Sequence, residues 1–283
     1  MTIELRQATA ADVPEMGRIV YEAFTDIAES HGFPPDFPSI EFAVGVSGLL
    51  VQQENIYSIA AVDGGTLRGS NHLDLWDEVG GIGPISVDLS AQGGGVGRTL
   101  MQHALDHARE SGFDRVRLMQ DAFNMRSLAL YASLGFNVVE PVAYLELSSV
   151  GPVDPNFRPA TPADFEAMDA LCREIYGISR TNEIASLAAA GFPGFVIDRG
   201  RITGYLLATQ IGHGVAETDD DLLALYRSLG ASSPGSLSNL PMRQGELYRR
   251  ALADGHRNRK VMNLMALGPY DDPKGTWTPS VIF

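Results

Sequence analysis

The sequence contains one cysteine and no long uninterrupted apolar segment. Cys172 cannot form an internal disulfide, and its apolar neighbours at helical spacing favour a buried, inert thiol over a reactive one. This cysteine usage suits a reducing, cytoplasmic setting. A membrane-spanning helix needs a run of about 18 apolar residues, which the sequence lacks, and its first residues do not resemble the apolar core of a signal peptide.

Basic residues are also few. The sequence has 21 lysines and arginines against 35 aspartates and glutamates, which gives a net charge of −14. Nucleic-acid-binding proteins need a basic surface, so we expect no such partner. No cysteine and histidine cluster has metal-ligand spacing, so we expect no metal. An anionic ligand would have to be held by local groups, chiefly backbone N–H donors.

Two similar halves make up the 283 residues. The segments IELRQATAADV and FRPATPADF each contain an arginine, then Ala-Thr, then an aspartate before a helical pattern, with Thr9 and Thr161 at matching places. Such a long-period echo suggests a tandem duplication. The Gly- and Pro-containing stretch between the copies predicts a linker at 149–156, between domains 1–148 and 157–283.

Hydrophobic periodicity in the first half predicts helices that alternate with strands. The helices are expected at 11–24, 96–111 and 126–134, and the main strands at 57–62, 69–76, 81–89, 115–120 and 137–147. The second half is similar but less regular. This order predicts an α/β fold with mixed sheets.

A glycine-rich turn is the most informative stretch. A strand ends near Leu89, the chain turns through Gly93, Gly94 and Gly95, and a helix begins at Val96. Glycines expose backbone N–H groups, and the helix N-terminus adds a positive dipole, so the turn can hold a pyrophosphate. The dinucleotide-binding and P-loop patterns both fail here, because their glycine spacing and Gly-Lys-Ser/Thr ending are missing. An empty flexible turn is the remaining alternative.

The turn has a wider context. Gln92-x-x-Gly95-x-Gly97 resembles the Gln/Arg-x-x-Gly-x-Gly/Ala signature of the GNAT N-acetyltransferase superfamily, and a segment from Asn124 through Tyr131 to Gly135-Phe136 resembles its second motif. The resemblance covers about residues 3–147. It implies two tandem GNAT-like domains, each a twisted, largely antiparallel sheet with a splayed central strand and flanking helices, and acetyl-coenzyme A as cosubstrate.

By this resemblance, acetyl-coenzyme A is bound chiefly by main-chain groups. Those expected to contact it belong to Ile85, Val87, Leu89, Gln92, Gly93, Gly94, Gly95, Val96, Gly97 and Arg98, with Asn124 and Ser127 at the pantetheine. Asn124 equally suits a helix N-cap. Val87 would donate its N–H to the oxyanion. Tyr131 occupies the family's position for the general acid, and its alternative is an aromatic core residue.

At the position of the general base the sequence differs from some members of the family, because Gly81 stands where they carry a glutamate. His72 has a suitable ordinary pKa, and Asp74, Asp77 and Glu78 are further candidates. Each also suits a solvated strand-edge position, and a water chain could replace them. The acceptor is expected near His31, Phe33 and Phe37, where phenylalanines lie among prolines and acidic residues. A plain surface loop is the alternative.

The second half looks like a degenerate copy without coenzyme A binding. Its counterpart of the glycine turn is predicted at 208–216, with His213 where a glycine is required, and four carboxylates follow at a helix start. They would repel a pyrophosphate. We therefore expect an N-acetyltransferase for a primary amine of a small molecule, acting as a monomer or homodimer. The alternatives are a non-catalytic acyl-coenzyme A sensor and, less consistent with the sequence, a protein acetyltransferase.

Overall fold

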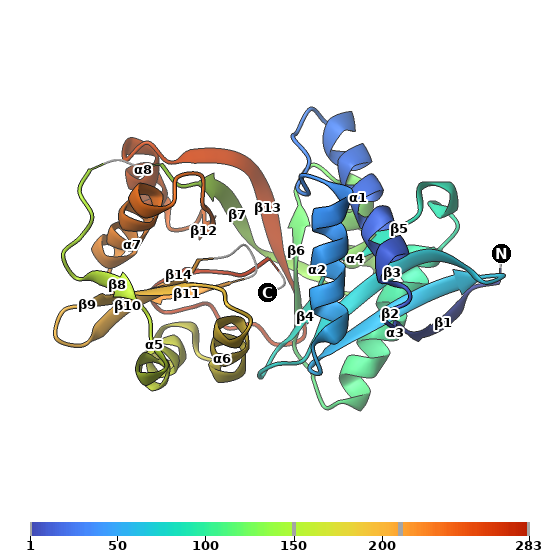
Figure 1. Ribbon diagram of the computed structural model, residues 1–283, viewed down its shortest axis with the longest axis horizontal. Coiled ribbons are helices and arrows are strands. Elements are labelled where there is room, and N and C mark those ends of the chain that lie inside the picture. The colour runs from blue at the N-terminus through green and yellow to red at the C-terminus, as the bar shows by residue number, and fades with distance from the viewer. Residues whose placement is uncertain (1, 149–150, 209–211, 282–283) are drawn as a thin grey trace. The chain divides into compact units, whose positions relative to one another are not determined.

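The computed structural model describes residues 2–148, 151–208 and 212–281, which form two compact units (Figure 1). Unit 1 contains the chain up to Leu118 and Phe123–Phe136. Unit 2 contains Met119–Ala122 and Asn137–Val281. The units therefore do not divide at the predicted linker, of which 149–150 lie outside the described residues. Strand β7 (Asn137–Glu146), expected to close the first domain, pairs instead with two strands of the second half, β12 (Leu237–Pro241) and β13 (Arg257–Leu267).

Unit 1 has an antiparallel sheet in the order β1-β2-β3-β4. Its strands are β1 (Glu4–Gln7), β2 (Ile56–Asp63), β3 (Thr66–Asp74) and β4 (Gly80–Ile82), and β4 runs parallel to the start of β6 (Val116–Asp121). Gly64 and Gly65, both with positive φ, make the β2–β3 turn. Side chains alternate across this sheet, so adjacent residues of one strand meet different helices.

Three helices cover the two faces of the unit 1 sheet. Helices α1 (Val13–Ser30) and α2 (Ile40–Gln52) lie side by side over one face (Figure 1). Helix α3 (Val96–Glu110) packs on the other face, where the ring of Tyr57 from β2 stacks on His107 at 3.8 Å. Helix α2 is not predicted from the sequence, because its apolar residues run almost continuously and show no clear 3.6-residue period.

Unit 2 contains a second sheet, in the order β14-β11-β10-β9-β8. These strands are β8 (Phe157–Pro159), β9 (Gly194–Asp198), β10 (Ile202–Leu207), β11 (Gly214–Ala216) and β14 (Thr276–Thr278), and the helices are α5 (Phe165–Tyr176), α6 (Thr181–Ala189), α7 (Asp219–Ser232) and α8 (Gly245–Ala253). The core of α7 is fully buried, with Leu222, Leu225 and Tyr226 at 0% exposure.

The predicted internal repeat is confirmed by matching hydrogen bonds. Thr9 donates to Asp12 from its backbone N–H at 2.8 Å and from its hydroxyl at 2.9 Å, and Arg6 binds the same carboxylate. Thr161 donates to Asp164 over the same two distances, and Arg158 takes the place of Arg6. Each strand thus turns into its first helix through the same contacts, as expected for two copies of one ancestral unit.

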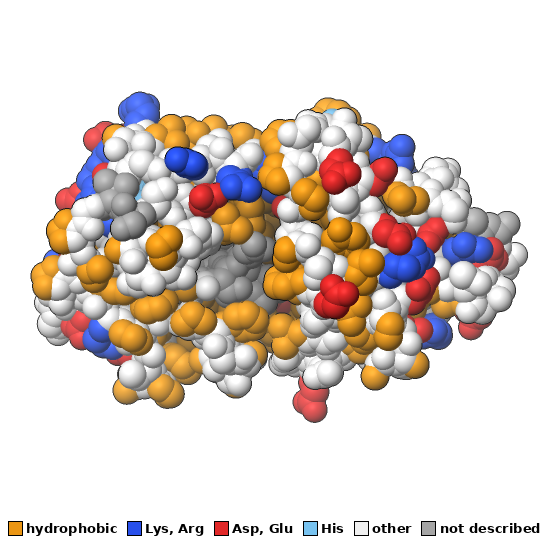
Figure 2. Space-filling model, turned by 45° about the horizontal axis from the view of Figure 1, so that its top comes forward, with side chains coloured by type: hydrophobic (Ala, Val, Ile, Leu, Met, Phe, Trp, Pro, Cys, Tyr) orange, Lys and Arg blue, Asp and Glu red, His pale blue; other side chains and the backbone are white. Residues whose placement is uncertain are grey.

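Acidic side chains occur at several separate places on the face of unit 1 that Figure 2 displays, rather than in one patch. Cys172 is buried, and burial raises the pKa of its thiol to about 12, which agrees with an inert thiol. No helix within the described ranges combines the length and the hydropathy that crossing a bilayer requires.

Candidate active site

The central strand of unit 1 is divided in two. The predicted strand 81–89 is interrupted after β4 at Gly83 and Pro84, and it resumes as the short β5 (Ser86–Val87). Proline has no N–H to donate to a neighbouring strand, which explains the interruption. Strand β4 pairs with β6 only as far as Ile82 and Leu118, whereas the pairs that the structure records for β5 are with β3. The splay between the central strands begins at this interruption.

The alternation of an antiparallel ladder shows which backbone groups face the splay. Val87 lies opposite Gly69, and the next residue, Asp88, donates its N–H to the Arg68 carbonyl at 2.9 Å. The backbone N–H of Asp88 therefore faces β3, and the N–H and carbonyl of Val87 point to the opposite, open edge. Ile85, two residues earlier, falls on the same side by this alternation. Leu89 does not extend the strand: it begins a 3₁₀ turn, η1 (Leu89–Ala91).

The glycine turn leads directly into α3, as predicted. Gly93 and Gly95 have φ values of 79° and 89°, a region that L side chains rarely adopt. A Cβ added at either would meet nothing within 4 Å, so both face open space. Gly95 is the N-cap of α3 and has no side chain to cap the helix, which leaves its first N–H groups available. The turn thus has the geometry of an anion cradle.

Gln92 connects this turn to β5 and to the next helix. Its Nε2 donates to the Val87 carbonyl at 3.3 Å, and its Oε1 accepts from Nη1 of Arg126 at 2.6 Å. Arg126 lies in the first turn of α4 (Met125–Ser133). Arg126 was not predicted as a site residue, although its place two residues after Asn124 put it inside the second motif.

Other contacts hold the turn from both sides. Arg98 donates to the Ser133 hydroxyl at 2.7 Å, which ties α3 to α4. Asp88 accepts from Ser90 and from Arg18 of α1, at 2.9 Å for the arginine. The hydrogen bond from the Ser90 hydroxyl lowers the pKa of Asp88 most, and the hydrogen bond from the Arg18 guanidinium lowers it as well. This carboxylate therefore stays ionised. A Cβ added at Gly97, the second residue of α3, would lie 3.6 Å from the side chains of Val87 and Leu130, which is an ordinary van der Waals contact.

Helix α4 carries the predicted Asn124, Ser127 and Tyr131. Asn124 is the N-cap: its Oδ1 accepts from the Ser127 N–H at 3.1 Å, and the Ser127 hydroxyl donates back to the Asn124 carbonyl at 3.0 Å. The capping alternative for Asn124 is therefore confirmed, and it is compatible with a contact to ligand. Tyr131 is buried, and its ring lies 6.2 Å from that of Phe136.

His72 is not at a solvated strand edge. It is 1% exposed in the interior strand β3, and its Nδ1 lies 2.8 Å from the hydroxyl of Ser58 directly opposite on β2. Burial lowers the pKa of His72 to about 4, so the imidazole is neutral near pH 7. It lies on the α1 and α2 face, since the preceding Asn71 points to Met101 of α3.

The other base candidates have different surroundings. Asp74 is buried on the same face of β3 as His72 and accepts from the Trp76 N–H at 2.8 Å. Glu78 is exposed, and Asp77 is half-buried in the bend that follows β3. Gly81 pairs with Asp74 across β3 and β4. The place of the missing glutamate is therefore next to a carboxylate on the neighbouring strand.

Two of the three predicted acceptor residues meet the start of α4. The Phe33 ring stacks on Phe123 at 4.4 Å, and His31 lies 5.4 Å from the same ring. Phe37 packs instead against Phe24 at 5.2 Å and so belongs to a separate contact. Phe123 directly precedes Asn124, which brings the α1–α2 loop to the second motif. Phe123 was not predicted as a site residue because no periodicity in the sequence connects it to Phe33.

In unit 2 the strand before the helix has no open edge. Strand β11 pairs with β10 on one side and with β14 on the other, where Val215 lies opposite Trp277. The predicted counterpart of the glycine turn, 208–216, is wrong: residues 208–213 lie between β10 and β11, and residues 214–216 form β11 itself. Of these, residues 209–211 are outside the described part. The residues that lead into α7 are Glu217 and Thr218, with no glycine.

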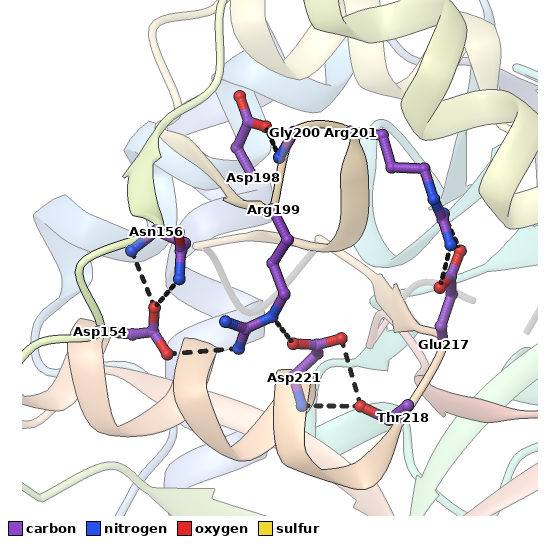
Figure 3. A network of polar contacts seen from close by, with 9 residues as sticks. All are labelled: Asp154, Asn156, Asp198, Arg199, Gly200, Arg201, Glu217, Thr218 and Asp221. Atoms are coloured by element: carbon purple, nitrogen blue, oxygen red, sulfur yellow. Dashed lines mark hydrogen bonds and ion pairs between the residues drawn. The ribbon is translucent and has the colours of Figure 1, made fainter.

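The start of α7 is occupied by the chain's own charges (Figure 3). Thr218 caps the helix by accepting from the Asp221 N–H at 3.1 Å, and Arg199 donates to the Asp221 carboxylate at 2.9 Å. Arg201 pairs with Glu217. These carboxylates interact favourably with the helix dipole and occupy the place where an anionic ligand would bind.

A tyrosine equivalent to Tyr131 is also missing from unit 2. The Phe136 N–H donates to the Tyr131 carbonyl just beyond α4, at 3.1 Å. Just beyond α8, the His256 N–H donates to the Ala251 carbonyl at 3.2 Å in the same relation. Ala251 therefore stands at the position of Tyr131 and has no group that could donate a proton.

Comparison with known proteins identifies the class. Residues 17–136 match the sequence profile of the Acetyltransferase (GNAT) family, and they include β5, the glycine turn and α4. This part of the chain is therefore similar to the GNAT acetyltransferases. A mycothiol acetyltransferase of Saccharomonospora viridis is 40% identical over 62 residues, which is 22% of this chain and 20% of that protein. The match thus spans about a fifth of that relative's length.

Solved structures agree with a tandem fold. A proposed acetyltransferase from Pyrococcus horikoshii superimposes with a TM-score of 0.76 at 16% identity, over 96% of this chain and 91% of the other. A tandem GNAT protein from the clavulanic acid biosynthesis pathway has a TM-score of 0.58 at 15% identity, over 95% and 100% of the two chains. At these identities the likeness concerns the fold, and the predicted tandem GNAT architecture is confirmed.

Proposed function

We propose that unit 1 binds acetyl-coenzyme A and transfers its acetyl group to a primary amine of a small molecule. The observation that carries this proposal is the open edge of β5 beside the uncapped N-terminus of α3. An extended thioester arm needs free backbone groups along a strand, and a diphosphate needs convergent N–H donors. Both occur together in unit 1.

The chain's own groups divide the binding task. Main-chain groups of Ile85 and Val87 would contact the pantetheine, and the amides from Gln92 to Arg98 would hold the diphosphate. The cradle fits a diphosphate because Gly93 and Gly95 face open space, where a side chain would interfere. Asn124 and Ser127 would limit the pantetheine path at the start of α4.

The reaction forms a bond between the amine nitrogen and the thioester carbonyl carbon and breaks the carbon–sulfur bond. The oxygen that becomes negative in the tetrahedral intermediate would accept from the Val87 N–H. The departing thiolate would take a proton from Tyr131, and the attacking nitrogen would lose one. A tyrosine hydroxyl is a suitable acid here because its ordinary pKa is close to that of a thiol.

The amine must first become neutral, because an ordinary alkylammonium has a pKa near 10. We propose His72 as the group that receives this proton, through water, on the α1 and α2 face of the sheet. Its low pKa makes it a weak acceptor, so it would pass the proton on rather than keep it. Asp74, two residues away on the same face, is the alternative acceptor.

We propose that the acceptor binds beside Phe33, Phe123 and His31, where stacked rings provide an apolar wall. The test is a turnover screen with acetyl-coenzyme A over amines, amino acids, polyamines and aminoglycosides, together with the acceptor of the mycothiol acetyltransferases. Release of coenzyme A above the hydrolysis background with one class of amine is expected. If acetyl-coenzyme A binds but no amine in the panel is acetylated, the sensor function favoured by the missing carboxylate at Gly81 replaces this proposal.

A further inference from the structure

The side-chain amide of Gln92 has only one possible orientation. A guanidinium can donate hydrogen bonds but cannot accept them, so the Gln92 atom 2.6 Å from Arg126 Nη1 must be the amide oxygen. The amide nitrogen then points at the Val87 carbonyl, 3.3 Å away. Without Arg126 the amide could rotate and present its oxygen to that carbonyl, which would be repulsive.

Val87 is the residue that this amide holds. The carbonyl and N–H of Val87 share the open edge of β5, and β6 does not pair with β5 there. With two ladder residues, Ser86 and Val87, β5 has few hydrogen bonds to fix its direction. The Gln92 amide is the described side-chain contact that restrains the Val87 peptide on the open side.

Resting on the proposed function, we infer that Arg126 is a positioning residue: it orients the Gln92 amide, which holds the Val87 carbonyl so that the Val87 N–H faces the thioester oxygen. Arg126 needs no contact with the acetyl group for this role. Its guanidinium lies at the surface, so its replacement should leave the fold intact. A small rotation of the donor weakens stabilisation of the oxyanion more than it weakens binding.

The test is a double-mutant cycle with Arg126→Gln and Gln92→Leu. Each single variant should lower kcat by about tenfold, the value of one charge-assisted hydrogen bond. The double variant should be no slower than Gln92→Leu, because Arg126 acts through Gln92. Arg126→Lys, which can still donate to Oε1, should retain most of the rate. Arg109→Gln, at the far end of α3 and paired with Asp106, is the matched control and should behave as wild type.

A second readout needs no acceptor. Difference infrared spectra of bound [1-¹³C]acetyl-coenzyme A report hydrogen bonding to the thioester carbonyl. Binding to the wild type should shift the carbonyl stretch to lower wavenumber, and Arg126→Gln and Gln92→Leu should return it toward the free value. If Arg126→Gln only weakens binding, with the stretch and kcat unchanged, Arg126 contacts the phosphates and the inference fails. If the wild type does not bind acetyl-coenzyme A at all, the proposed function fails first.

Discussion

The two units share a common start and differ where the central strand meets the helix. Thr9 with Asp12 and Thr161 with Asp164 make the same hydrogen bonds. Farther along, β5 keeps one edge open, whereas β11 has β14 on the corresponding edge. The comparison teaches that a duplicated fold can lose a binding site when its own chain fills the site. Unit 2 needs no ligand there, because its backbone groups are already paired.

The helix starts of the two units differ in the same way as the strand edges. Helix α3 begins at an uncapped Gly95, and α7 begins at Thr218 with three aspartates in its first turn. The first arrangement leaves N–H donors for a ligand, and the second satisfies them internally. In unit 1 both the strand edge and the helix start therefore keep backbone groups available for a ligand, whereas in unit 2 both are satisfied by the chain itself.

The largest expected effect comes from giving α3 the carboxylate that α7 has. Gly95→Asp places a negative charge at the proposed diphosphate cradle and strains a residue with φ of 89°. We expect acetyl-coenzyme A affinity to fall by more than about 100-fold, since like charges brought together cost several kcal/mol. The measurement is calorimetric titration.

Gly112→Asp is the control for Gly95→Asp. Gly112 follows α3, has a φ of 86° and also faces open space, so the substitution introduces the same strain away from the cradle. Its affinity for acetyl-coenzyme A should equal that of the wild type. Equal losses in the two variants would show that strain, and not charge at the cradle, is responsible.

The next effect separates the two buried histidines. His213 of unit 2 lies 3.0 Å from the Glu183 carboxylate. Burial raises the pKa of Glu183, but the combined effect of Arg180 and His213 is larger and keeps this pKa below its ordinary value. His72 of unit 1 has a serine partner, and burial lowers its pKa to about 4. The unfolded imidazole binds a proton below its ordinary pKa of 6.5, whereas folded His72 does not until about 4. Stability contributed by neutral His72 is thus present above pH 6.5 and is lost as the pH falls toward 4.

The loss due to His72 should reach about 2 kcal/mol at pH 5 relative to pH 8. In His72→Gln this part of the pH dependence should be absent, as measured by urea unfolding at several pH values. Parallel pH profiles for the two proteins would contradict a buried, neutral His72. His213→Gln is not a suitable control, because it would leave Glu183 buried with one partner fewer.

A smaller effect tests the general acid, which unit 2 replaces with Ala251. Tyr131→Phe removes only the hydroxyl, so acetyl-coenzyme A should bind as before while acetylation slows more than about tenfold. Steady-state rates and calorimetry on the same preparation measure the two quantities. An unchanged rate with an unchanged affinity would assign Tyr131 to the core rather than to proton transfer.

The smallest effect concerns the acidic start of α7. Asp220 is well exposed and pairs with Arg250 at the surface, so Asp220→Asn should change stability by no more than about 0.5 kcal/mol. It should also create no second binding site, because β14 still covers β11. A gain of acetyl-coenzyme A binding in unit 2 would mean that charge alone closes that site.

Local patterns in the sequence predict much of unit 1 and the start of the second copy in unit 2. The Thr9 and Thr161 starts, the Gly64-Gly65 turn and the α3 start each depend on a few adjacent residues, and all three are present in the structure. The pairing of β7 with β12 and β13 and the cover that β14 provides for β11 are long-range choices. They follow from tertiary packing, which has no signature within a short window.

The same distinction applies to the site. Gln92, the glycines and Asn124 follow from motif spacing, and the structure places them along one turn and the next helix. Arg126 and Phe123 were missed because their partners, Gln92 and Phe33, are distant in sequence. The division of the strand 81–89 could have been anticipated from Pro84, which removes a ladder donor.

The most direct test is the number of acetyl-coenzyme A molecules that one chain binds. Calorimetric titration of the full chain should give one molecule per chain, and a structure of the complex should place its diphosphate at residues 93–98. Two molecules per chain, or one bound beside β11 and β14, would contradict the account.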